Sequence, residues 1–193
     1  MQSIYSQKKM TMKKTLFLIV FLLIGVSQLM HAQDKKNAVK LSLLAPFIKT
    51  LNLGYERILS EKASFQVHGY YTGYSDKSGD PTAKMKGFGI IPEVRLYLSE
   101  KKTAPGGFFV APFIRYDNFS VTDSYDDGSE ISGSYSDFGG GLLIGHQSVF
   151  SNIVTLDAYI GPQYIFGSAD TGIDTPRLNG VLPRGGVTIG LLF

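Results

Sequence analysis

The chain has 193 residues, with 19 Lys and Arg against 16 Asp and Glu, and it contains no cysteine and no tryptophan. Four of the basic residues and none of the acidic ones lie in residues 1–33, so the remaining chain has 15 basic against 16 acidic residues. A chain without a basic surplus lacks the electrostatic signature of a nucleic-acid-binding protein. The absence of cysteine excludes disulfides and thiol chemistry.

The first 33 residues have the pattern of a cleavable secretory signal peptide. Four lysines form a basic n-region, an apolar run covers residues 16–26, and Met30-His31-Ala32 provides a small-residue cleavage site. The apolar run is shorter than the roughly 20 residues that a helix needs to span a bilayer. The sequence therefore predicts a signal peptide over residues 1–33 and one domain over residues 34–193.

Beyond residue 34, short segments alternate apolar and polar residues, which is the period-two pattern of a strand with two different faces. Polar segments containing Gly and Pro separate them. The pattern predicts strands over residues 38–44, 51–56, 65–72, 87–98, 108–119, 135–150, 153–166 and 185–193. Short turns near residues 59, 99 and 151 alternate with longer loops that start near residues 75, 120 and 167. This spacing predicts an all-β, eight-stranded antiparallel up-and-down transmembrane β-barrel, with short turns in the periplasm and long loops outside.

The last strand alternates large apolar residues with Gly or Thr and stops on an aromatic residue. It resembles the C-terminal signature of outer-membrane barrels, which the barrel assembly machinery reads. We therefore expect Ile189, Leu191 and Phe193 to form a membrane-insertion signature. We also expect this strand to pair with the strand that contains Lys40.

Charged residues lie in the middle of the predicted strands, opposite the large aliphatic side chains. They are Lys40, Glu56, Glu93, Arg95, Arg115 and Asp157. In a soluble lipocalin-like cup this charged face is the outside. In a membrane barrel it is the lumen, because an Arg at the bilayer midplane costs roughly 2–4 kcal/mol. The terminal aromatic residue and the Tyr and Phe residues near strand ends favour the membrane barrel.

A small barrel has an interior filled by side chains, so buried charges must pair with each other. The repeat Pro92-x-x-Arg95 and Pro112-x-x-Arg115 on two adjacent strands predicts that Glu93 lies between Arg95 and Arg115 in an ion-pair plug. Pro92, Pro112 and Pro162 fall inside predicted strands. Because proline cannot donate to a ladder, they must occupy bulges or non-bonded positions.

Few residues suggest catalysis or metal binding. His146-x-Ser148 is similar to the His-x-Ser element of outer-membrane lipid A deacylases, with Ser148 as nucleophile and His146 as its base. The alternative, two polar residues at the membrane boundary, is favoured because no acidic partner is nearby and the pair falls at the predicted periplasmic end. The acidic segment 126–130 lacks the spacing of a calcium loop and is expected to be a solvated turn. His68 is expected to be a satisfied interior histidine. We expect no catalytic residue, cofactor or metal.

Several segments resemble a family of uncharacterised small outer-membrane barrels common in Bacteroidetes, related in architecture to OmpA/OmpX-type barrels. They are Asn37-Ala38-Val39-Lys40-Leu41, Leu53-Gly54-Tyr55-Glu56-Arg57, Pro92-Glu93-Val94-Arg95, Gly140-Gly141-Leu142-Leu143-Ile144-Gly145 and the terminal Phe193. The resemblance implies an outer-membrane location and supplies no catalytic residues.

The expected function is therefore that of a non-enzymatic barrel with a plugged lumen, acting as a structural or surface-interaction protein through its outer loops. Its partners are outer-membrane lipid, the barrel assembly machinery and an unknown extracellular partner, and nucleic acid is not among them. Two alternatives remain open: a lipid A-modifying hydrolase that uses His146 and Ser148, and a narrow channel for small solutes.

Overall fold

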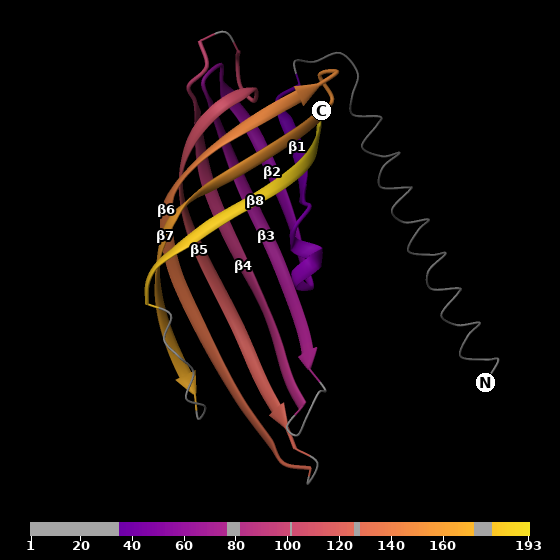
Figure 1. Cartoon of the computed structure of the whole chain (residues 1–193), viewed down its shortest axis with the longest axis vertical. Coiled ribbons are helices and arrows are strands. Elements are labelled where there is room, and N and C mark those ends of the chain that lie inside the picture. The colour runs from indigo at the N-terminus through magenta and orange to yellow at the C-terminus, as the bar shows by residue number, and fades with distance from the viewer. Residues whose placement is uncertain (1–34, 77–81, 101, 126–127, 172–178) are drawn as a thin grey trace, which may run out of the picture. The chain divides into compact units, whose positions relative to one another are not determined.

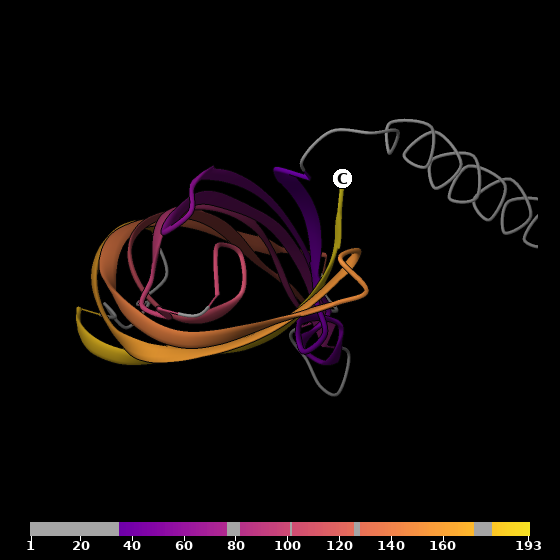
Figure 2. The ribbon, with the colours of Figure 1, turned by 90° about the horizontal axis from the view of Figure 1, so that it is seen from above.

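A computed structural model describes residues 35–76, 82–100, 102–125, 128–171 and 179–193. Within these ranges the strands are β1 (Asn37–Ser42), β2 (Thr50–Ser60), β3 (Ala63–Asp76), β4 (Thr82–Tyr97), β5 (Gly107–Ser124), β6 (Glu130–Phe150), β7 (Val154–Thr171) and β8 (Gly180–Leu192), with one 3-10 helix, η1 (Ala45–Ile48). Each strand pairs antiparallel with the next, and β8 pairs with β1, so the strands form a closed barrel (Figures 1 and 2). The predicted all-β, up-and-down architecture is confirmed.

The connections alternate between the two ends of this barrel. One end, called the turn end, has the connections after β2, β4 and β6, and it is uppermost in Figure 1. The other end, called the loop end, has the connections after β1, β3, β5 and β7. This grouping of connections is the one that the sequence predicts. Among the described residues, no helix is long and apolar enough to cross a membrane.

Several strands extend further toward the loop end than the sequence suggests. Most of the predicted loop over residues 120–134 is strand, since β5 continues to Ser124 and β6 begins at Glu130. Similarly, β3 and β4 extend into the predicted loop at residues 75–86, and β7 and β8 extend into the one at 167–183. These segments have few apolar residues or, in β8, apolar residues without regular alternation, so they lack the pattern that marks a strand. Their backbone nevertheless continues the ladder, as in the pair Thr122 and Ser132.

The two faces of the barrel wall differ sharply in chemistry. Large aliphatic side chains point outward and are exposed, as with Leu41, Leu53, Ile90, Leu96, Ile114, Ile144, Ile160 and Ile189. Polar and charged side chains point inward and are buried, as with Lys40, Glu56, Gln66, His68, Glu93, Arg95, Asp117, Gln147, Asp157 and Thr188. One part of the interior is apolar, formed by Ile91, Tyr97, Phe109, Ala111, Phe113 and Leu143. The predicted inward and outward faces of these strands are confirmed.

The three prolines fit into the sheet without a bulge. Between β4 and β5 the pair Ile90 and Tyr116 is followed by the pair Glu93 and Phe113, so the register is unchanged across Pro92. The same holds between β6 and β7, where the register continues past Pro162. On its other side Pro162 stands opposite Pro183 of β8. Of the two predicted possibilities, the prolines therefore occupy non-bonded positions.

The connection between β4 and β5 folds over the turn end of the ring (Figure 2). Its backbone is tied down where the Ala104 N–H donates to the Glu61 carbonyl at 2.7 Å. Pro105 and Gly106 are buried, and Ala104 packs against the apolar part of the interior. This connection therefore covers the turn end of the barrel.

Candidate functional site

Lys40 of β1 lies at the centre of a buried polar cluster in the turn-end half of the barrel. Its Nζ lies 2.8 Å from Glu56 Oε2 of β2 and 2.8 Å from Asp157 Oδ2 of β7. It also donates to Gln147 Oε1 of β6 at 2.8 Å. All four side chains are buried, so one cation joins strands from different parts of the wall.

Arg95 of β4 is the second cation of this cluster. Its Nε donates to Glu93 Oε1 at 2.6 Å, and its Nη1 donates to Gln147 Oε1 at 2.7 Å. A weaker bond of 3.4 Å reaches Asp157 Oδ1. The guanidinium also lies 4.2 Å from the ring centroid of Phe109, within the range of a cation–π contact. Because Glu93 and Arg95 are two residues apart on one strand, the strand itself places them on the same face.

Neutral side chains supply the remaining hydrogen bonds. Glu56 Oε1 accepts from Ser64 Oγ at 2.5 Å and from the Tyr97 hydroxyl at 2.8 Å. Asp157 Oδ2 accepts from Thr188 Oγ1 at 2.7 Å. A buried carboxylate is costly unless it is paired and hydrogen-bonded, and these donors meet that need. The inner network consists of Lys40, Glu56, Ser64, Glu93, Arg95, Tyr97, Gln147, Asp157 and Thr188.

Arg115 belongs to a separate cluster nearer the loop end. Its guanidinium pairs with Asp117, its Nη1 donates to Gln163 Oε1 at 3.0 Å, and its Nε lies 3.9 Å from Asp137 Oδ1. The Tyr70 hydroxyl donates to Asp117 Oδ1. The outer network consists of Tyr70, Arg115, Asp117, Asp137 and Gln163.

The structure therefore brings together only part of the predicted Glu93, Arg95 and Arg115 plug. Glu93 and Arg95 form an ion pair, whereas the described ion pairs of Arg115 go to Asp117 and Asp137. The register explains the difference, because Phe113 and not Arg115 stands directly across from Glu93. Sequence reasoning placed Lys40 and Asp157 on the inner face but did not assign them to the plug, and it missed Gln147 because an amide has no charge.

A glycine provides the space for the outer network. A Cβ at Gly89 would overlap both Asp117 Oδ1 and the ring of Tyr70, closer than any side chain tolerates. Gly89 therefore allows Tyr70 to reach Asp117 across β4. This is a case of a strand glycine that marks a close approach.

His68 is a satisfied interior histidine, as the sequence predicts. Its side chain is buried, with Nε2 2.5 Å from Gln66 Nε2 and Nδ1 3.0 Å from Asn52 Oδ1. Its neighbours occupy both ring nitrogens, which leaves no nitrogen open toward a metal. In the described part of the chain, no group of three or more His, Asp or Glu residues is arranged to hold a metal ion.

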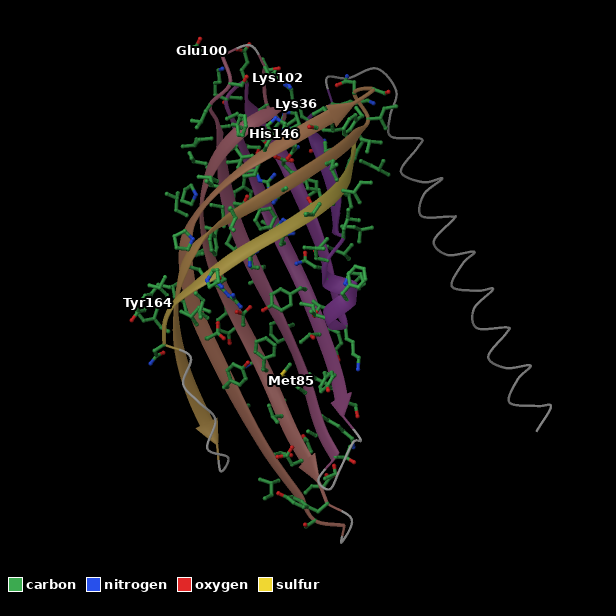
Figure 3. The ribbon with its side chains drawn as sticks, in the orientation of Figure 1. Lys36, Met85, Glu100, Lys102, His146 and Tyr164 are labelled. Atoms are coloured by element: carbon green, nitrogen blue, oxygen red, sulfur yellow. The ribbon has the colours of Figure 1, made fainter. Side chains whose placement is uncertain are left out.

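His146 and Ser148 lie on the outward face of β6, near the turn end (Figure 3). The His146 ring packs edge-on against Phe108, with centroids 4.7 Å apart. Its neighbours across the strands are Phe108 and Ala158, and the neighbour of Ser148 on β7 is Leu156. Among the described residues no hydrogen bond joins His146 to Ser148 or to a carboxylate, so the geometry of an activated serine is not formed.

The remaining predicted residues lie on β8 or outside the described ranges. Ile189 and Leu191 are exposed on the outward face of β8. Their role with Phe193 as an insertion signature stays a prediction. Asp126 and Asp127 of the acidic segment lie outside the described residues, as does the predicted signal peptide.

Comparison with known proteins places the chain in a family. No curated protein matches it. Neisserial surface protein A (NspA) has a TM-score of 0.47 and 14% identity, with 82% of this chain and 95% of that chain covered. A major outer membrane protein from Thermus thermophilus has a TM-score of 0.46 and 14% identity, covering 83% and 100%. CarO2 from Acinetobacter baumannii has a TM-score of 0.42 and 12% identity, covering 82% and 98%. A family model described as a protein of unknown function, DUF3575, matches residues 17–171, and the chain therefore belongs to this family.

Proposed function

We propose that the protein is a non-enzymatic outer-membrane β-barrel with a lumen plugged by side chains, acting as a structural or surface-interaction protein through its loop end. One observation supports this above all others: the barrel buries most of the charged side chains in the middle of its strands and exposes most of its large aliphatic ones. A barrel in water has the reverse arrangement, with apolar side chains inside.

The outer surface supports the membrane location. Isolated exposed apolar residues are ordinary on soluble proteins, but a soluble monomer rarely exposes an apolar patch larger than a few hundred Å². Here exposed large apolar or aromatic residues occur on every strand from β1 to β8, and every strand except β3 includes exposed aliphatic ones. Exposed aromatic residues accompany them on both sides of this belt, as with Tyr71, Tyr116, Tyr164 and Phe166 toward the loop end and Tyr55, Phe65, Phe108 and Phe150 toward the turn end. This arrangement is typical of the aromatic girdles of outer-membrane barrels.

The inner network supports the plug. Lys40, Glu56 and Arg95 have no exposed surface, although all three are charged. Their bonds connect β1, β2, β4, β6 and β7 through the middle of the barrel. Water or a solute that passed along the lumen would have to break several charge-assisted hydrogen bonds, which are about twice as strong as neutral ones. The connection over the turn end adds a second barrier.

The loop end supports a role in surface interaction. Strands β5 and β6 continue past the aliphatic belt as a polar ribbon, where Thr122 Oγ1 lies 3.2 Å from Ser132 Oγ and Ser124 Oγ donates to Glu130 Oε1 at 3.0 Å. A ribbon in which polar residues outnumber Val121 and Ile131 is suited to water and not to lipid. We infer that it projects from the membrane and contacts an extracellular partner.

Electrophoresis of unheated and boiled samples tests the membrane barrel. We expect protein extracted from outer-membrane fractions to migrate differently before and after boiling, because a folded barrel keeps its compact shape in detergent. A soluble fraction that contains the folded protein, or identical migration of both samples, would contradict the proposal.

The hydrolase alternative has its own test. Replacing Ser148 with Ala is expected to leave the lipid A profile of the cell unchanged, because His146 and Ser148 lack an acidic partner among the described residues. Mass spectrometry of extracted lipid A makes the comparison. A profile that differs between the two strains would favour the enzyme over the structural barrel.

A further inference from the structure

A cavity of about 490 Å³ lies in the loop-end half of the barrel. Its volume falls within the range of roughly 300–1,000 Å³ that is common for small-molecule sites. Apolar side chains line part of it, including Ala45, Ile48 and Met85, and Thr72 contributes a hydroxyl. Figure 3 shows Met85 in this half of the barrel, far from the turn end. The inner network lies on the turn-end side, so the cavity is separate from that network, and none of its members lines the cavity.

Two arginines line this cavity, and the lining residues that the structure describes include no carboxylate. Arg115 is already paired with Asp117. Arg184 of β8 differs, because its guanidinium lies 5.1 Å from the ring centroid of Phe113 and 5.8 Å from that of Tyr159 and contacts no carboxylate within ion-pair distance in the described part of the chain. The aromatic rings hold the side chain in place without neutralising its charge.

The Nε atom of Arg184 is buried and has no hydrogen-bond partner. Leaving a buried donor unsatisfied costs about 1–3 kcal/mol, and more for a charged group. Native structures keep few such groups, and each one calls for an explanation. A ligand with an acceptor oxygen in the cavity would satisfy this donor and pair with the charge.

The barrel wall is incomplete beside this cavity. Strand β1 pairs with β8 only as far as Ser42 and Thr188, followed by the bond from the Leu43 N–H to the Val187 carbonyl. Residues 180–186 of β8 continue toward the loop end and pair with β7 alone. Helix η1 occupies this break in the wall, well short of the ends of β3 and β4 (Figure 1). Its Phe47 and Ile48 are exposed at 83% and 71%.

We propose that this cavity binds a single-chain anionic amphiphile, with its carboxylate or phosphate on Arg184 and its hydrocarbon chain passing between η1 and β8. The apolar lining accounts for the chain, the unpaired guanidinium for the anion, and the break in strand pairing for the route of entry. The binding site stands apart from the inner network, and Tyr70 and Arg115 of the outer network line it. Only the lipid origin of the ligand rests on the proposed membrane location, which the migration experiment tests separately.

NMR of ¹⁵N-labelled protein in neutral-detergent micelles tests this site directly. The Nε–Hε signal of Arg184, assigned by its loss in Arg184→Gln, should shift saturably on addition of decanoate or decyl phosphate. Decanol has the same chain without the charge, and inorganic phosphate has the charge without the chain, so each should bind at least about tenfold more weakly. Binding of decanoate alone identifies a fatty acid as the source of the ligand, and binding of decyl phosphate alone identifies a phospholipid product.

Calorimetric titration of variants completes the test. Arg184→Gln should weaken binding of the preferred amphiphile by about tenfold or more, and Ala45→Leu, which fills the cavity from η1, should weaken it as well. Arg57→Gln removes an exposed arginine outside the cavity and should leave binding unchanged. The proposal is overturned if neither amphiphile binds, if decanol or inorganic phosphate binds as tightly, or if Arg184→Gln binds like the wild type.

Discussion

Lys40 is the residue on which the inner network depends most, because it pairs with two carboxylates from opposite sides of the β1 strand. We predict that Lys40→Met lowers the free energy of unfolding by about 3–5 kcal/mol, since it removes the cation from the buried Glu56 and leaves Asp157 with only its weaker contact to Arg95. The folded fraction in urea, read from the difference in gel migration, measures the loss. Lys36→Met, at an exposed position, is the control and should change stability by less than about 0.5 kcal/mol.

Neutralising Glu93 distinguishes a plug centred on Lys40 from a plug centred on Glu93. Glu93→Gln is expected to cost less than Lys40→Met, about 1–3 kcal/mol, because Arg95 keeps its bonds to Gln147 and Asp157. The same urea titration gives the comparison. A larger loss for Glu93→Gln than for Lys40→Met would favour the Glu93-centred arrangement that the sequence suggests, and no loss at all would argue against a plug that includes Glu93.

Two glycines of neighbouring strands offer a matched pair for the outer network. Gly89→Ala is expected to destabilise the barrel by about 1–3 kcal/mol, because its methyl group would displace Tyr70 and Asp117. Gly69→Ala adds the same methyl group where no atom lies within 4 Å, so it should be neutral or slightly stabilising. Urea titration of both variants makes the comparison. Equal effects of the two substitutions would show that Gly89 does not provide the space for the outer network.

The sequence predicts the face of a residue far better than its partner. Period-two alternation places Glu93, Arg95 and Asp157 inside, and burial confirms all three. Which inward-facing side chains contact each other depends on the register between neighbouring strands. The pattern within one strand does not give this register. Arg115 therefore finds Asp117 on its own strand instead of Glu93 on the next one. Asp137, across the ladder from Asp117, lies inside the predicted strand over residues 135–150, but the alternation within that strand does not show that it approaches Arg115.

At the scale of the strand, the pairing of β1 with β8 closes the barrel. Val39 and Leu191 are register partners on the outward face, and the chain contains no native cysteine. We predict that Val39→Cys combined with Leu191→Cys forms a disulfide on oxidation, since opposite residues of paired strands have Cβ atoms about 4.5–5.5 Å apart. The oxidised, boiled chain should then migrate faster than the reduced one on a gel. The control is Val39→Cys with Ile144→Cys. Ile144 lies on β6, which does not pair with β1, so this variant should show no such difference.

The extent of the strands was harder to predict than their number. Apolar alternation finds the part of a strand that touches an apolar environment, so it locates β3 and β7 but assigns their polar loop-end segments to loops. Ladder hydrogen bonds do not require apolar side chains, and polar pairs such as Thr122 and Ser132 extend β5 and β6 as strands. The sequence predicts separate strands over residues 38–44 and 51–56, but it does not predict helix η1 between them, because one helical turn leaves no periodic signal.

At the scale of the whole molecule, the two networks and the covered turn end predict a barrel that does not conduct. Purified protein in planar bilayers should give no steady single-channel steps. The inner network connects strands across the lumen, and its Lys40, Arg95 and Gln147 side chains have no exposed surface. A porin recorded in the same bilayers provides the positive control. Clear and reproducible steps would support the small-solute channel instead of the plug.

The short strand β1 has a consequence for the order in which the barrel assembles. It has 6 residues, whereas β6 has 21, and its partner β8 lies at the other end of the sequence. Bringing together strands that are so far apart in the sequence is entropically costly, and the few hydrogen bonds of a short ladder offset little of that cost. We expect β1 and β8 to join last, after the longer hairpins have formed. Until then both strands present open edges that invite wrong pairing. An assembly factor that holds these two edges would act at this step. Rapid cross-linking of the Val39→Cys, Leu191→Cys double variant during refolding would show when β1 and β8 pair.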